Sequence, residues 1–262
     1  MNPFFFGSSR RRLFGLYNPA RGARGRDRAA LLCYPWGHEY IYAHRSMTRL
    51  AFSLAEAGIH VLRFDYYGTG DSAGEMTEAS LAGWREDIAT AIEELSDMSG
   101  AERVSLIGLR LGATLAARVA AEEPRAVEAV ALWDPVVSGA EYRDWLFHAA
   151  AHMPIGAAPP PERPGEAGGG HEVVGFPLTE AMEAEIAEAD ILSSVQGLPP
   201  RLLAVATQPV ASHGAFGEAL AARTPPAALE MIEDKAAWHE DWPLDAGMVP
   251  VQVLDRLVRW MS

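Results

Sequence analysis

Residues 105–114 read Ser-Leu-Ile-Gly-Leu-Arg-Leu-Gly-Ala-Thr, and this stretch decides the fold. It begins with the apolar run of a buried strand, and the alanine-rich residues 111–122 that follow have helical spacing. Gly108 and Gly112 flank Arg110, as expected where a sharp turn brings a helix close to a neighbouring strand. The stretch therefore predicts a strand, a tight turn with Arg110 at its apex, and a helix.

The rest of the chain alternates between strand and helix patterns. The strand patterns cover residues 29–35, 60–65, 103–107, 128–133, 201–206 and 227–232. The helical patterns cover residues 46–57, 80–96, 111–122, 214–222 and 249–261. Such alternation predicts βαβ units and a parallel sheet, and Phe4-Phe5-Phe6 suits an edge strand. With the turn at Arg110 in the place of a nucleophile elbow, the sequence predicts an α/β-hydrolase fold, with helices on both faces of a mostly parallel sheet.

The alternation is interrupted between residues 140 and 198. A segment dense in proline and glycine, 154–170, separates helical patterns at 140–152 and 178–195. We interpret 140–198 as a helical cap, inserted into a core made of 1–139 and 199–262. The alternative is an insertion without function.

Composition limits the partners. The 262 residues carry a formal net charge of −13, which argues against nucleic acid or an anionic membrane surface as the partner. Cys33, the one cysteine, lies in an apolar strand pattern and is interpreted as a small buried hydrophobe. No apolar run approaches the roughly 20 residues that span a bilayer, so we expect a cytoplasmic protein. No phosphate-binding loop, dinucleotide fingerprint or metal-ligand cluster appears, and we expect neither cofactor nor metal.

Arg110 replaces the serine that hydrolases of this fold carry at the elbow. A guanidinium stays protonated and cannot form an acyl-enzyme. Its planar N–H groups, beside a helix N-terminus, suit a carboxylate or an oxyanion. Arg110 is therefore either an anion clamp or half of an internal ion pair that fills an inactive site.

A histidine and an acid complete the predicted catalytic set. His239 follows the last strand pattern, where the fold places its catalytic histidine, and we interpret it as a general base; an ordinary surface histidine is the alternative. The usual acid position, Thr207-Gln208-Pro209, has no carboxylate. Asp134 is the nearest substitute and is expected within hydrogen-bond reach of His239. Because it precedes Pro135, shaping the turn is the alternative role of Asp134.

The loop after the first buried strand predicts the oxyanion site. Backbone N–H groups of Gly37 and His38, together with that of Leu111, are placed to bind a developing oxyanion. Glu39 is the expected partner of Arg110 in an ion pair. The predicted oxyanion and substrate-binding set is Gly37, His38, Glu39, Leu111 and Trp133.

Three motifs carry a resemblance to a known family. They are the elbow Gly-Leu-Arg-Leu-Gly-Ala, residues 132–139 (Leu-Trp-Asp-Pro-Val-Val-Ser-Gly), and the loop 35–40 (Pro-Trp-Gly-His-Glu-Tyr). They resemble exosortase A system-associated hydrolases, most closely the second type. The resemblance covers residues 29–145 well and the cap poorly. It implies a setting among exopolysaccharide or secondary-metabolite genes, but no established reaction.

Two functions remain open at the level of sequence. The first is an enzyme acting on an ester, a thioester or a related acyl group, free or carrier-bound, without a serine acyl-enzyme. In this enzyme His239 is the general base, Asp134 orients His239, and Arg110 holds the acyl oxygen of the substrate. The second is a non-catalytic relative whose pocket binds an acyl ligand or a partner protein.

Overall fold

The chain folds around one eight-stranded sheet. The computed structural model describes residues 1–21, 27–152, 170–235, 238 and 248–262. The strands lie in the order β1-β2-β4-β3-β5-β6-β9-β10, and all neighbours from β4 to β10 are parallel. β2 alone runs against the other seven strands, so its pairings with β1 and β4 are antiparallel, and β1 lies at the edge as predicted. The strands are β1 (Asn2–Gly7), β2 (Arg12–Asn18), β3 (Ala29–Cys33), β4 (His60–Phe64), β5 (Val104–Leu109), β6 (Val127–Trp133), β9 (Arg201–Ala206) and β10 (Leu229–Met231).

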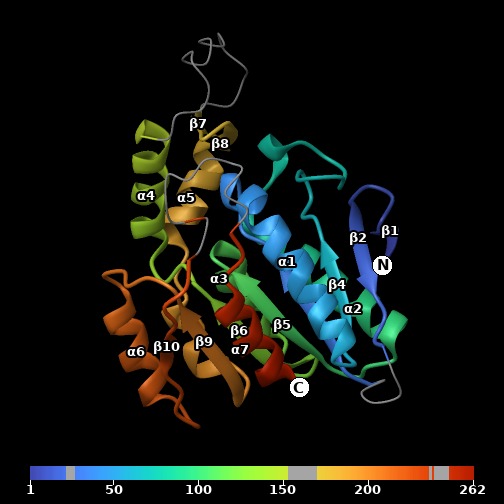
Figure 1. Ribbon diagram of the computed structural model, residues 1–262. Helices are drawn as coiled ribbons and strands as arrows, with labels where there is room; N and C mark the ends of the chain where they lie inside the picture. Colours follow the sequence, from blue (N-terminus) through green and yellow to red (C-terminus); the bar gives the residue numbers. More distant parts are fainter. Residues whose placement is uncertain (22–26, 153–169, 236–237, 239–247) are drawn as a thin grey trace.

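Helices cover both faces of this sheet, which confirms the predicted fold class (Figure 1). α1 and α7 pack against each other on one face, and α2 packs against α3 on the other. Every residue of β3 and β5 is buried, as expected for strands covered on both sides. No helix in the described ranges is both long and apolar enough to cross a membrane. The helices are α1 (His38–Glu56), α2 (Leu81–Ser99), α3 (Leu111–Glu122), α4 (Gly139–His152), α5 (Glu180–Glu188), α6 (His213–Ala222) and α7 (Val251–Met261), with short 3₁₀ helices η1 (Met76–Glu78) and η2 (Leu192–Gly197).

The insertion lies between β6 and β9, which are neighbours in the sheet. It contains α4, a hairpin of β7 (Gly170–Val173) and β8 (Phe176–Thr179), α5 and η2. The single helix expected over 178–195 is therefore wrong. Thr179 caps α5 by accepting a hydrogen bond from the Met182 N–H, and Asp190 accepts bonds from the N–H groups of Leu192 and Ser193. Because side chains of this kind satisfy backbone donors locally, they start α5 late and separate it from η2. Most of the predicted loop 154–170 lies outside the described residues.

Two elbow glycines fix how closely α3 approaches the sheet. A Cβ added at Gly112 would lie 2.2 Å from the Tyr34 carbonyl oxygen and 2.5 Å from that of Cys33. A Cβ added at Gly108 would lie 2.4 Å from the Ala113 Cα. All these atoms belong to the backbone, so no side chain can rotate away to make room. The close approach predicted from the sequence is therefore present.

We expect Gly112→Ala to destabilise the fold by about 1–3 kcal/mol, because a methyl group would be forced against two carbonyls. Gly217→Ala in α6 is the matched control, since a Cβ there meets nothing within 4 Å. The control should be neutral or stabilise by about 0.4–1 kcal/mol. Urea unfolding followed by tryptophan fluorescence measures both. Equal stability of the two variants would contradict this account of the elbow.

Candidate active site

Arg110 lies at the apex of the elbow, between the end of β5 and the start of α3. Its backbone has φ 54° and ψ −124°, a conformation that non-glycine residues rarely adopt. The Arg110 N–H donates to the Trp133 carbonyl oxygen at 3.0 Å, which ties the turn to β6. Strained backbone of this kind is concentrated at functional sites. The predicted elbow is present, with an arginine at its apex.

The Arg110 side chain forms a buried ion pair with Glu39. Its Nε lies 2.6 Å from Glu39 Oε1, and the two side chains are 9% and 0% exposed. The Tyr142 hydroxyl, from α4, donates to the other Glu39 oxygen at 2.7 Å. Arg110 Nη1 donates to the Asp134 backbone carbonyl at 3.3 Å. The predicted pairing is therefore present, and it joins α1, the elbow and α4.

Two aromatic rings of α4 complete the surroundings of the guanidinium. Arg110 Cζ lies 5.3 Å from the Tyr142 ring centroid and 5.4 Å from that of Trp145, within cation–π range. Burial acts to lower the Arg110 pKa, but the charge and hydrogen bond of Glu39 together with the nearby Tyr142 and Asp134 outweigh it, and the net shift is upward. Burial and the Glu39 charge raise the Tyr142 pKa well above its ordinary value. Arg110 therefore stays charged, and Tyr142 stays a neutral phenol that donates to Glu39.

Arg110 also borders a cavity of about 180 Å³. Its Nη2 group makes no hydrogen bond with the described residues, so it can donate to a ligand. The ion pair therefore occupies the elbow without filling the space beside it. The other walls include Val136, Tyr142, Trp145, Gln208 and Val210.

Asp134 lies at the end of β6 with φ 43° and is 2% exposed. Its Oδ1 accepts the Thr207 N–H at 2.6 Å, and its Oδ2 accepts the Thr207 hydroxyl at 2.8 Å. Trp238 Nε1 donates to Oδ2 at 3.1 Å. Thr207 stands where this fold usually has its catalytic acid, and here it donates hydrogen bonds to Asp134, the predicted substitute for that acid. His239 lies outside the described residues, so its predicted bond to Asp134 and its role as base stay predictions.

The predicted oxyanion donors stand at the first turns of two helices. Gly37 is the N-cap of α1 with φ 64°, followed by His38, and Leu111 is the first residue of α3. First-turn N–H groups have no acceptor within their own helix and are free to bind an oxyanion. The His38 ring stacks on Trp145, with centroids 5.4 Å apart, and burial lowers its pKa, so the imidazole is neutral. Its two ring nitrogens find no hydrogen-bond partner in the described part of the chain.

Two further residues singled out in the sequence have buried side chains. The Trp133 ring is 0% exposed and packs edge-on against Trp238. It does not line the cavity, so its visible contribution to the site is the carbonyl oxygen that holds the Arg110 N–H. Cys33 is 0% exposed, and burial raises the pKa of its thiol to about 12, which suits a small hydrophobe.

Tyr142, Trp145 and Thr207 are the site residues that the sequence reasoning missed. Tyr142 and Trp145 are three residues apart in α4, so they lie on one helix face, and both contact Arg110. That spacing was the available signal. No sequence signal pointed to Thr207, because its role depends on where Asp134 lies.

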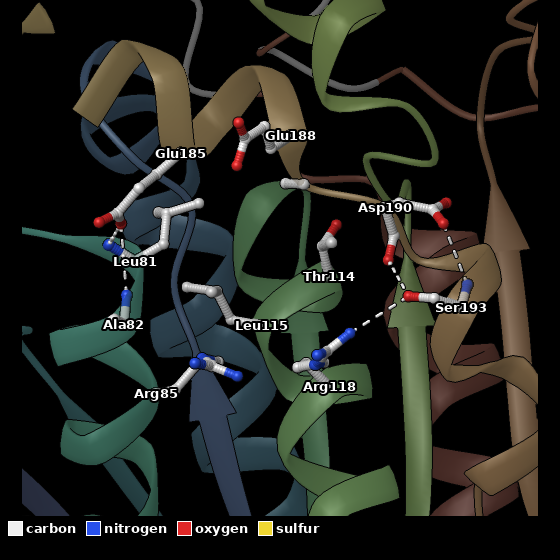
Figure 2. A pocket seen from close by; sticks show the side chains of 11 residues that line it. Leu81, Ala82, Arg85, Thr114, Leu115, Arg118, Glu185, Glu188, Asp190 and Ser193 are labelled. Atoms are coloured by element: carbon white, nitrogen blue, oxygen red, sulfur yellow. Dashed lines mark hydrogen bonds between the residues drawn. The ribbon is translucent and has the colours of Figure 1, made fainter. Parts of the chain in front are cut away.

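A separate pocket of about 370 Å³ lies between α2, α3 and α5 and shares no lining residue with the Arg110 cavity (Figure 2). Arg85 and Arg118 lie at one end of it, and Glu188 lies on the opposite side. Glu185 accepts the Leu81 N–H at 2.5 Å, which fastens α5 to the start of α2. Neither pocket, nor the rest of the described ranges, gathers three or more histidine, cysteine or acidic residues that could hold a metal.

Comparisons with known proteins agree with this architecture. The family described as serine aminopeptidase, S33, matches residues 38–159. Human ABHD12B is 35% identical over 113 residues, and the human mitochondrial palmitoyl-protein thioesterase ABHD10 is 38% identical over 69. These matches cover 42% and 26% of this chain, and only 30% and 21% of the relatives' own lengths.

A solved structure shares the fold over its full length. Est1E from Butyrivibrio proteoclasticus superposes with a TM-score of 0.70, covering 100% of this chain and 98% of that one. Its sequence identity is 14%, so the likeness concerns the fold. The sheet order, the elbow and these matches show that the chain has an α/β-hydrolase fold.

Proposed function

We propose that this protein is an enzyme that acts on an ester, a thioester or a related acyl substrate without a serine acyl-enzyme. The observation that carries the proposal is the cavity that Arg110 lines, at the elbow where this fold places its chemistry. The α/β-hydrolase fold and the palmitoyl-protein thioesterase among the similar proteins support an acyl substrate. The predicted exosortase-associated setting and the cytoplasmic location belong to the same proposal.

Each group has one role in the proposed reaction. Arg110 Nη2 and the N–H groups of Leu111 and His38 donate to the substrate carbonyl, and more strongly to the oxyanion that forms from it. His239 takes a proton from water, which attacks the carbonyl carbon directly. The carbonyl re-forms as the alcohol or thiol leaves with a proton, so no bond to the protein is made. Positioned bases and oxyanion donors each contribute about 10²-fold or more to a rate.

We expect His239→Ala to lower kcat for short-chain esters by about 10²–10⁴-fold, because the water loses its base. The readout is product release from a panel of p-nitrophenyl esters and acyl thioesters. His171→Ala is the matched control, because His171 is an exposed histidine on β7. Equal rates for the two variants would rule out His239 as the base.

A fluorophosphonate probe should leave the protein unlabelled, because no described serine occupies the elbow. Ser72 donates to the Asp65 carbonyl and Ser212 donates to Glu141, so neither hydroxyl is arranged as a nucleophile. Intact-mass spectrometry measures labelling, with a serine hydrolase as the positive control. Stoichiometric labelling at Ser72, Ser138 or Ser212 would overturn this account of the elbow.

The second candidate is a non-catalytic protein that binds an acyl ligand or a partner. The observation that favours it is the set of three hydrogen bonds from Thr207 and Trp238 to Asp134, which gives that carboxylate a structural role. In this case Arg110→Ala weakens ligand binding, whereas His239→Ala changes neither binding nor any rate. Turnover that depends on His239 would exclude it.

A further inference from the structure

We infer that the Arg110 cavity takes a short, uncharged acyl group, and that Glu39 sets this preference by neutralising Arg110. The inference rests on the proposed function, since it names the acyl group that the site accepts. It replaces the simpler expectation that an arginine at the elbow selects a carboxylate.

The balance of charge disfavours an anionic ligand. Arg110 is the one cation among the described residues that line the cavity, and Glu39 already pairs with it at 2.6 Å. Glu141 lines the same cavity, and the Asp134 carboxylate, at the end of the neighbouring strand, also interacts electrostatically with Arg110. One positive charge thus faces three negative ones. A ligand carboxylate would meet net repulsion in a buried site, where charges are poorly screened.

The carboxylates that could attract a cationic ligand already accept hydrogen bonds from the protein. Glu39 accepts from Arg110 and Tyr142 through its two oxygens. Glu141 accepts the Ala211 N–H at 3.1 Å and the Ser212 hydroxyl at 2.5 Å. The Asp134 oxygens accept the bonds from Thr207 and Trp238. An ammonium group would have to share these carboxylate oxygens with the donors that already engage them, so an uncharged group is favoured.

The size and lining of the cavity favour a short chain. Its 180 Å³ is below the range of about 300–1,000 Å³ that holds drug-sized ligands. Val136, Val210 and the rings of Tyr142 and Trp145 offer apolar walls to an alkyl chain. Arg110 Nη2 can donate to an uncharged carbonyl without requiring charge on the ligand.

Three amides of near-equal size separate the charge classes without any turnover. They are valeramide (uncharged), succinamate (anionic) and γ-aminobutyramide (cationic), titrated against the protein by ligand-observed NMR. Valeramide should bind about tenfold or more tightly than either charged amide. Val210→Trp, which places a large ring in the cavity, should abolish its binding. Tighter binding of a charged amide, binding that survives Val210→Trp, or no binding of any amide would each overturn the inference.

Changing Glu39 should move the preference. Glu39→Gln leaves Arg110 without its counter-charge, so affinity for succinamate relative to valeramide should rise about tenfold. If that variant does not fold, Glu141→Gln, which removes a partly exposed charge from the cavity wall, should shift the ratio in the same direction by a smaller factor. Glu188→Gln is the matched control, because it makes the same charge change on the other pocket and should not alter the ratio. An unchanged ratio in both Glu39→Gln and Glu141→Gln would overturn the role assigned to these carboxylates.

This binding test is separate from the test of the proposed reaction. Preferential binding of valeramide with no His239-dependent turnover would retain the ligand preference and reject the reaction. Turnover combined with tighter binding of succinamate would retain the reaction and reject the preference.

Discussion

The buried ion pair between Glu39 and Arg110 is the interaction on which the site depends. It joins the first turn of α1, the apex of the elbow and, through Tyr142, the helix that opens the insertion. Removing one partner of such a pair typically costs about 3–5 kcal/mol, because the other charge is left buried and unpaired. The pair therefore holds α4 over the core and fixes the one cation that lines the described part of the cavity.

The same interaction changes what an arginine at the elbow can do. An isolated guanidinium would attract carboxylates, but Arg110 has a neutralising partner, and its Nη2 group makes no hydrogen bond with the described residues. In the proposed function, Arg110 acts as a directed hydrogen-bond donor together with the first-turn N–H groups of α1 and α3. Such donors stabilise a developing oxyanion more than a neutral carbonyl, which is what catalysis without a covalent intermediate requires.

Local sequence patterns predicted the fold well, because the turn at Gly108-Leu109-Arg110-Leu111-Gly112 and the strand–helix alternation each depend on neighbouring residues. The Arg110–Glu39 pair was also predicted, since the loop after β3 and the elbow lie at the same edge of a parallel sheet. The helix expected at 178–195 was wrong because Thr179 and Asp190 satisfy backbone donors locally. Tyr142, Trp145 and Thr207 were missed because their contacts arise only when the insertion folds over the elbow and β9 lies beside β6. The role of His239 stays a prediction.

The central claim is acyl chemistry at this elbow without a bond to the protein. The most direct measurement follows product release and intact protein mass together, in samples quenched during turnover of a short-chain acyl thioester. The account predicts many turnovers per protein molecule while the mass of the chain stays that of the unmodified protein. An added acyl mass during turnover, or no product release above the uncatalysed rate, would contradict it.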